Sequence, residues 1–92
     1  MMTLPLQDKN ILVTGASSGI GKATAILFSE LGANVFITAR GEETLAETFQ
    51  SLKSSPNHFK INIDLTQIQD IKLLVKSLPV SIDGIAHCCG KI

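Results

Sequence analysis

The sequence lacks an excess of either charge, because eight lysines and arginines balance eight aspartates and glutamates. A net charge of zero argues against the polyanion-binding surface that nucleic-acid modules need, so we expect no nucleic-acid partner. No apolar run among the 92 residues is long enough to span a bilayer, so we expect no membrane partner. The opening MMTLPLQDKN lacks the basic and apolar blocks of a signal peptide, which predicts a cytoplasmic protein.

Cysteine is also scarce, and its placement is informative. Cys88 and Cys89 are the two cysteines, and they are adjacent in an apolar run. Neighbouring residues of a strand point to opposite faces, so a disulfide between them is not expected. We expect reduced, buried thiols in the cytoplasm.

Apolar residues, by contrast, are plentiful. They make up 45% of the chain, which is enough for the packed core of one small domain over residues 1–92. Short apolar runs of strand type alternate with segments of helical spacing. Strands are expected over 10–14, 34–39, 58–64 and 82–89, and helices over 20–31, 42–53 and 66–78. This alternation predicts an α/β fold, a parallel sheet with helices on both faces.

The helical spacing also predicts which side chains face the sheet. We expect the following apolar faces: Ile20, Ala23, Leu27 and Leu31 in the first helix; Leu45, Phe49 and Leu52 in the second; Ile68, Ile71, Val75 and Leu78 in the third. Thr66 and Gln69 have the spacing of a capping box at the start of the third helix.

A glycine-rich turn joins the first strand to the first helix, in the stretch ILVTGASSGIGKA. Backbone N–H groups converge at such a turn, and the helix dipole adds positive charge, which together favour an anion such as phosphate. Gly15 permits the tight turn, Gly19 permits close approach of a phosphate, and Gly21 permits the helix to pack closely on the strand. Ser17 and Ser18 can donate hydrogen bonds to phosphate oxygens.

A purely structural turn is the alternative for a lone glycine motif, but the flanking strand and helix favour a phosphate site. The stretch is not a P-loop, because Ala23 stands where the Mg²⁺-binding hydroxyl would be. Lys22 is expected to be an exposed lysine of the first helical turn. The spacing is T-G-x-x-x-G-x-G rather than G-x-G-x-x-G.

With this spacing, TGASSGIG resembles the cofactor loop of the short-chain dehydrogenase/reductase family, in its non-extended subgroup. LGANVFITAR, IDLT and IDGIAHCCG resemble the family's second, third and fourth strand segments. The resemblance implies the N-terminal half of a three-layer, Rossmann-type doubly wound sheet with strand order 3-2-1-4. It also implies that the loop holds a dinucleotide through Gly15, Ser17, Ser18, Gly19, Ile20 and Gly21.

The end of the second strand indicates which dinucleotide. An acidic residue there selects NAD, whereas a basic residue without an acid favours the 2′-phosphate of NADP. The sequence has Ala39 and Arg40 at this point, with no carboxylate before Glu42. We therefore predict NADP, with NAD less favoured; the alternative for Arg40 is an ordinary exposed loop arginine.

Two further contacts follow from the resemblance. Asp64 would accept from the adenine amino group while the Leu65 backbone contacts the ring; the alternative is that Asp64 caps the next helix. Cys89 and Gly90 would contact the cofactor through their backbone.

The fourth strand departs from the family, because HCCG stands where NNAG is usual. His87 puts the structural role of the family's asparagine in doubt. The alternatives for this cluster are a metal site, a Cys–His nucleophile and a redox pair, and packing is favoured over all three. His58 has no evident partner and is expected at the surface.

The resemblance implies an NADP-dependent oxidoreductase that transfers hydride between nicotinamide and a small carbonyl or alcohol substrate, and that forms a homo-oligomer. The family's catalytic Tyr-x-x-x-Lys is absent, since the chain has no tyrosine, so we assign no catalytic residue and expect this N-terminal fragment to be inactive alone. No metal is expected.

The alternatives are a non-catalytic dinucleotide-binding module, with a redox-sensing or regulatory role, and a folded fragment with an empty site. We also expect self-association through the exposed edge formed by 82–89.

Overall fold

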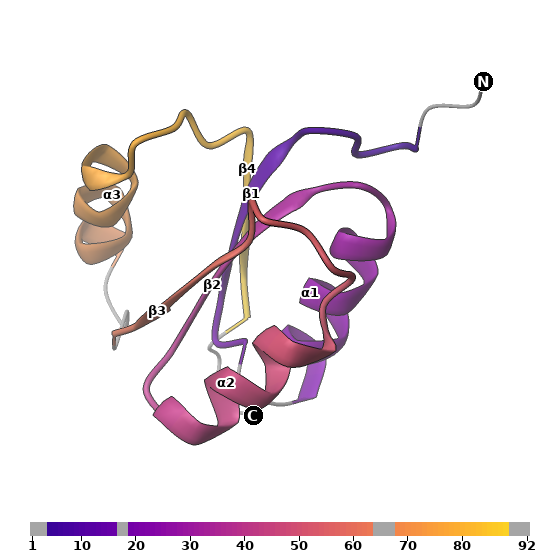
Figure 1. Ribbon diagram of the computed structural model, residues 1–92. Helices are drawn as coiled ribbons and strands as arrows, with labels where there is room; N and C mark the ends of the chain where they lie inside the picture. Colours follow the sequence, from indigo (N-terminus) through magenta and orange to yellow (C-terminus); the bar gives the residue numbers. More distant parts are fainter. Residues whose placement is uncertain (1–3, 17–18, 64–67, 89–92) are drawn as a thin grey trace.

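The computed structural model describes residues 4–16, 19–63 and 68–88, and it contains a four-stranded, all-parallel sheet (Figure 1). The strand order is β3-β2-β1-β4, which confirms the predicted order. The elements are β1 (Asn10–Thr14), α1 (Gly19–Glu30), β2 (Asn34–Ala39), α2 (Glu42–Ser51), β3 (Phe59–Asn62), α3 (Ile68–Ser77) and β4 (Gly84–His87).

The register brings the carboxyl ends of the strands to one edge of the sheet. Thr14, the last residue of β1, pairs with Thr38 of β2 on one side and with His87 of β4 on the other. Ala39 at the end of β2 pairs with Asn62 at the end of β3. In open parallel sheets ligands bind outside this edge, so the register places the glycine turn and the end of β2 where a ligand is expected.

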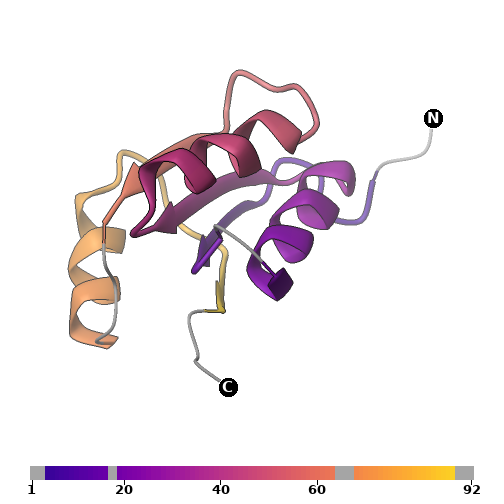
Figure 2. The same cartoon turned by 90° about the horizontal axis from the view of Figure 1, so that it is seen from below.

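Helices cover both faces of the sheet, as predicted. Figure 1 shows α3 on one side and α1 with α2 on the other, and Figure 2 shows the same separation from below. The cause is the alternation of side chains along β1. Ile11 and Val13 belong to the core under α1 and α2, whereas Leu12 packs with Ile71 of α3.

The predicted apolar face of α1 is wrong. Ile20 is 71% exposed and Leu27 is 51% exposed. The buried residues of α1 are Gly21, Ala25 and Ser29. A Cβ on Gly21 would lie 1.9 Å from the Gly15 carbonyl oxygen, so the helix begins too close to the glycine turn for a large side chain on that face. Because α1 lies so close to the turn and the sheet, its buried face has room for small residues only, and its larger apolar side chains face outward.

The predicted faces of the other two helices agree with the structure. Leu45 and Leu52 are buried, and Phe49 packs against the same core. Ile71 is buried on α3, with Val75 and Leu78 partly buried beside it. Thr66 and the side chain of Ile68 lie outside the described residues. Within the described part of the chain, no helix is both long and apolar enough to cross a membrane.

The two edge strands are shorter than the sequence suggests. The pairing of β3 covers Phe59–Asn62 rather than 58–64, and that of β4 covers Gly84–His87 rather than 82–89. Both strands have a partner on one side only within the described sheet. Phe59 stacks on Phe36 of β2, with ring centroids 5.2 Å apart, yet remains half-exposed. One-sided pairing leaves apolar side chains of both edges open to solvent.

His58 is buried, so its predicted surface position is wrong. The residue is only 8% exposed. The backbone N–H of Val35 donates to His58 Nδ1 at 3.0 Å, and Nε2 lies 2.8 Å from the carbonyl oxygen of Lys53. The neutral ring with its proton on Nε2 satisfies both partners. His58 therefore joins the start of β2 to the loop after α2, and only the tertiary structure supplies these two partners.

Candidate functional site

The described residues of the turn between β1 and α1, Gly15, Ala16 and 19–21, lie at the carboxyl edge of the sheet and are called the cradle below. Gly15 and Gly19 have φ values of 67° and 59°, the left-handed region that glycine adopts without strain. A Cβ on Gly19 would meet no atom within 4 Å, so the space beside this residue is open. The backbone of the helix N-terminus can thus be approached closely at Gly19, as a phosphate requires.

The cradle is attached to the strands on both sides of β1. The N–H of Ala16 donates to the Thr38 carbonyl of β2 at 3.0 Å, and the N–H of Cys88 donates to the Thr14 carbonyl at 3.1 Å. Ala16 and Thr14 are both fully buried. The entry to the turn is therefore held by backbone hydrogen bonds to its two neighbouring strands.

A side-chain hydrogen bond adds to this support at the end of β4. Thr14 Oγ1 and His87 Nδ1 lie 2.6 Å apart, across a register pair. An imidazole thus bridges β1 and β4 immediately before the glycine turn. The Cys88 thiol is free and packs against the core under α1 and α2. In the described residues no group of three potential metal ligands is found.

A cation follows the end of β2, the strand next to β1 in the sheet. Ala39 is buried, and the next residue, Arg40, is exposed. Asn62 of β3 donates from Nδ2 to the carbonyl oxygens of Ala39 and Arg40, at 3.0 and 2.7 Å. Gly41 then begins α2 without a side-chain cap. A guanidinium at this position can make forked, charge-assisted hydrogen bonds to a phosphate.

Several residues expected to bind a dinucleotide are not placed. Ser17, Ser18, Asp64, Leu65, Cys89 and Gly90 all lie outside the described residues. Gly15, Gly19, Ile20 and Gly21 lie together at the cradle, and Arg40 follows the adjacent strand. The structure therefore places the five described residues of the predicted set at one edge of the sheet.

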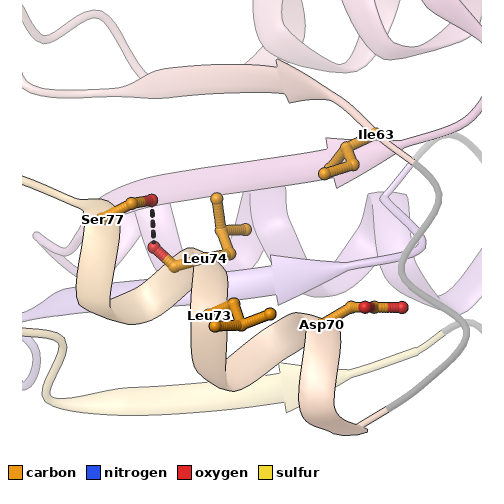
Figure 3. Close-up of a pocket in the computed structure, with 5 residues that line it drawn as sticks. All are labelled: Ile63, Asp70, Leu73, Leu74 and Ser77. Atoms are coloured by element: carbon orange, nitrogen blue, oxygen red, sulfur yellow. Dashed lines mark hydrogen bonds between the residues drawn. The ribbon is translucent and has the colours of Figure 1, made fainter.

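A separate hollow of about 400 Å³ lies between α3 and the end of β3 (Figure 3). Its lining comprises Ile63, Asp70, Leu73, Leu74 and Ser77. The Ser77 hydroxyl is already used, because it donates to the Leu74 carbonyl at 2.7 Å. None of the cradle residues contributes to this hollow, so it is not part of the glycine site.

Comparison with known proteins identifies the family. The family model for short chain dehydrogenases matches residues 9–88. The chain belongs to the short-chain dehydrogenase family. This family uses nicotinamide dinucleotide cofactors.

Individual family members agree with this assignment. The chain is 42% identical over 74 residues to the uncharacterized oxidoreductase Lin0452 of Listeria innocua, a match that covers 79% of this chain and 30% of that protein. A solved short chain dehydrogenase of Bacillus anthracis has a TM-score of 0.77 at 29% identity, covering 89% of this chain and 34% of that one. A short-chain dehydrogenase/reductase of Caenorhabditis elegans, solved with cofactor, has a TM-score of 0.68 at 37% identity, covering 78% and 28%. The chain thus spans about a third of the length of these short-chain dehydrogenases.

The described residues of the cradle leave room for a phosphate group. Open space lies beside Gly19. Because Gly21 has no side chain, the start of α1 can contact the backbone of the turn at Gly15. Sequence reasoning missed the Thr14–His87 bridge and the bonds from Asn62. Asparagine at a strand end is a weak sign of local backbone hydrogen bonding. The hydrogen-bond partners of His87 and Asn62 depend on the register between neighbouring strands, and this register cannot be read from a single sequence.

Proposed function

We propose that this chain is the cofactor-binding part of an NADP-dependent oxidoreductase that acts on a small carbonyl or alcohol substrate. The observation that carries the proposal is the open glycine cradle at the carboxyl edge of a parallel sheet, in a chain of the short-chain dehydrogenase family. Residues 1–92 are proposed to form one partial dinucleotide-binding domain.

The proposed binding residues divide by the part of the cofactor they hold. The phosphates would be held by the backbone of Gly15, Gly19, Ile20 and Gly21 and by the hydroxyls of Ser17 and Ser18. Asp64 and Leu65 would contact the adenine, and the backbone of Cys89 and Gly90 would complete the site. Backbone N–H donors at a helix N-terminus suit a diphosphate because they donate hydrogen bonds whatever the protonation state of nearby side chains, and the helix dipole favours negative charge there.

The 2′-phosphate is assigned to Arg40. Its exposed guanidinium follows a strand end that has no carboxylate, since Ala39 is buried and apolar. A carboxylate there would repel the phosphate of NADP and accept from the ribose hydroxyls of NAD. Arg40 and Ala39 together therefore favour NADP.

The bound dinucleotide would supply hydride transfer at its nicotinamide ring. The residues of this chain bind and orient it: the glycine backbone holds the diphosphate, and Arg40 holds the adenosine end. Proton exchange with a substrate oxygen needs a titratable group of suitable pKa beside it, and the chain contains no tyrosine to serve. We therefore propose that the chain alone has no dehydrogenase activity; turnover of NADPH with a carbonyl substrate by the purified chain would refute this.

The cofactor assignment is tested by titrating the chain with NADPH and NADH while following nucleotide fluorescence. We expect NADPH to bind more tightly, and Arg40→Ala to weaken NADPH about ten- to a hundredfold, the value of a charge-assisted contact. NADH affinity should stay unchanged, because NADH lacks the 2′-phosphate. Lys72→Ala, at an exposed position on α3, is the matched control for loss of one positive charge. Equal affinity of the wild-type chain for both nucleotides would contradict the NADP assignment.

A homo-oligomeric, cytoplasmic enzyme completes the proposal. The unpaired thiol of Cys88 suits a reducing compartment. The exposed Ile85 on the edge strand β4 suits contact with another chain.

A further inference from the structure

We propose that Asn62 is the positioning residue that aims Arg40 at the 2′-phosphate and so sets the preference for NADP. This inference rests on the NADP assignment made above. Asn62 does not touch the nucleotide in this proposal; it acts through the backbone on either side of Arg40.

Asn62 makes two hydrogen bonds to the backbone at the end of β2. Its Nδ2 donates to two successive carbonyl oxygens, those of Ala39 at 3.0 Å and Arg40 at 2.7 Å. Because both partners are carbonyl oxygens, the amide nitrogen and not the amide oxygen must face them. Successive carbonyls of a regular strand point in opposite directions, so a single side chain that reaches both marks the point where β2 turns out of the sheet.

These two bonds hold both peptide planes that flank Arg40. The Ala39 carbonyl belongs to the peptide before Arg40, and the Arg40 carbonyl belongs to the peptide after it. Peptide groups are planar, so the two soft dihedrals φ and ψ of Arg40 are set by how these planes are oriented. The N–H of Ile63 also donates to the Ala39 carbonyl, at 3.1 Å, which fixes the first plane further. Asn62 thereby fixes the direction in which the Arg40 side chain leaves the backbone.

Beyond Arg40 the backbone is anchored by α2, because the Gly41 carbonyl accepts from the Leu45 N–H at 2.9 Å and from the Thr44 hydroxyl at 3.1 Å. Arg40 itself lies between this anchor and the strand. Its side chain is exposed, and the next residue is Gly41, the freest residue type in backbone conformation. Gly41 is the N-cap of α2 and makes no side-chain capping bond. Without Asn62, we expect the turn at Arg40–Gly41 to sample several directions.

The direction of the Arg40 side chain matters because two glutamates follow Arg40 closely in the sequence. Glu42 and Glu43 occupy the first turn of α2. Their negative charge would repel a 2′-phosphate bound near Arg40. An arginine held in one direction loses less conformational freedom on binding and can offset that repulsion. Fixing one such side chain in advance changes affinity by about three- to tenfold.

The experiment uses the 92-residue chain and titrates it with NADPH and NADH. Asn62→Leu removes the donor, and Asn62→Thr keeps strand preference while leaving at most one hydroxyl donor. We expect Asn62→Leu to weaken NADPH binding about three- to tenfold with NADH unchanged, which a general loss of folding would not produce. Asn57→Leu, at an exposed asparagine in the turn before β3, is the matched control. If circular dichroism shows that Asn62→Leu does not fold, Asn62→Thr replaces it in the titration. We expect Asn62→Thr to weaken NADPH binding in the same way but by a smaller factor.

A double-mutant cycle tests the route through Arg40. In the Arg40→Ala background, Asn62→Leu should leave NADPH affinity unchanged, because the group it positions is gone. Equal losses for NADPH and NADH, an unchanged NADPH:NADH ratio, or a full further loss in the Arg40→Ala background would each overturn the role of Asn62. A wild-type chain that binds both nucleotides equally would overturn the NADP assignment, and this inference with it.

Discussion

At the scale of single residues, His58 shows how much can depend on one side chain. Its ring accepts from the Val35 N–H and faces the Lys53 carbonyl, so it satisfies two backbone groups of separate segments. Removing a partner from a buried polar group costs more than the bond itself contributes, because the group stays unsatisfied.

His58→Ala should therefore lower the free energy of unfolding by about 3 kcal/mol, measured by urea denaturation. His58→Gln offers an acceptor and a donor on one side chain and should recover part of that loss. Asn57→Ala, at an exposed neighbour, should stay within about 0.5 kcal/mol of the wild-type value. An alanine variant as stable as the wild type would show that these two bonds contribute nothing.

At the scale of elements, α1 and the glycine turn depend on one another. The start of α1 approaches the turn so closely that a Cβ on Gly21 would overlap the Gly15 carbonyl oxygen. The obstacle is backbone rather than a flexible side chain, so either the turn or the helix must move. The conformation of the cradle and the position of α1 therefore depend on each other.

Gly21→Ala should destabilise the chain by about 2–3 kcal/mol through overpacking, and should weaken nucleotide binding as well. Gly84→Ala is the matched control, because a Cβ on Gly84 in β4 meets nothing within 4 Å. That substitution should be neutral or stabilise by about 0.5–1 kcal/mol, since it restricts the unfolded chain. Urea denaturation of both variants measures the contrast; similar effects of the two changes would refute the close packing of α1.

At the scale of the whole molecule, the sheet exposes apolar surface along β4. Ile85 is 50% exposed on a strand that pairs only with β1 in the described sheet. Unprotected edges of this kind pair with other chains, and natural proteins often protect them with lysine.

We expect the purified chain to self-associate at high micromolar concentration and Ile85→Lys to shift it toward the monomer in light scattering. Leu73→Lys, which changes a 66% exposed leucine on α3, should leave the association unchanged. A wild-type chain that is monomeric at that concentration would contradict the prediction.

Most of the architecture was predictable from the order of the residues. The bounds of β1 and β2 match the predicted ranges, because both are near-continuous apolar runs ended by glycine or a charged residue. The edge strands were predicted too long, since hydrophobicity does not reveal where pairing stops. Four of the predicted site positions lie together at the cradle, and Arg40 lies at the end of the neighbouring strand. The hydrogen bonds of Asn62 and His87 could not be predicted, because they depend on the register between strands.

The sequence by itself determined the alternation of strands and helices, the parallel sheet and the position of the glycine turn. These follow from local periodicity and from the backbone freedom of glycine, which neighbouring residues specify. The tertiary structure decided which face of α1 is buried, what His58 bonds to and which side chain donates to the Arg40 carbonyl. Each of these depends on how closely distant segments approach, and that distance is set by packing and register rather than by any local pattern.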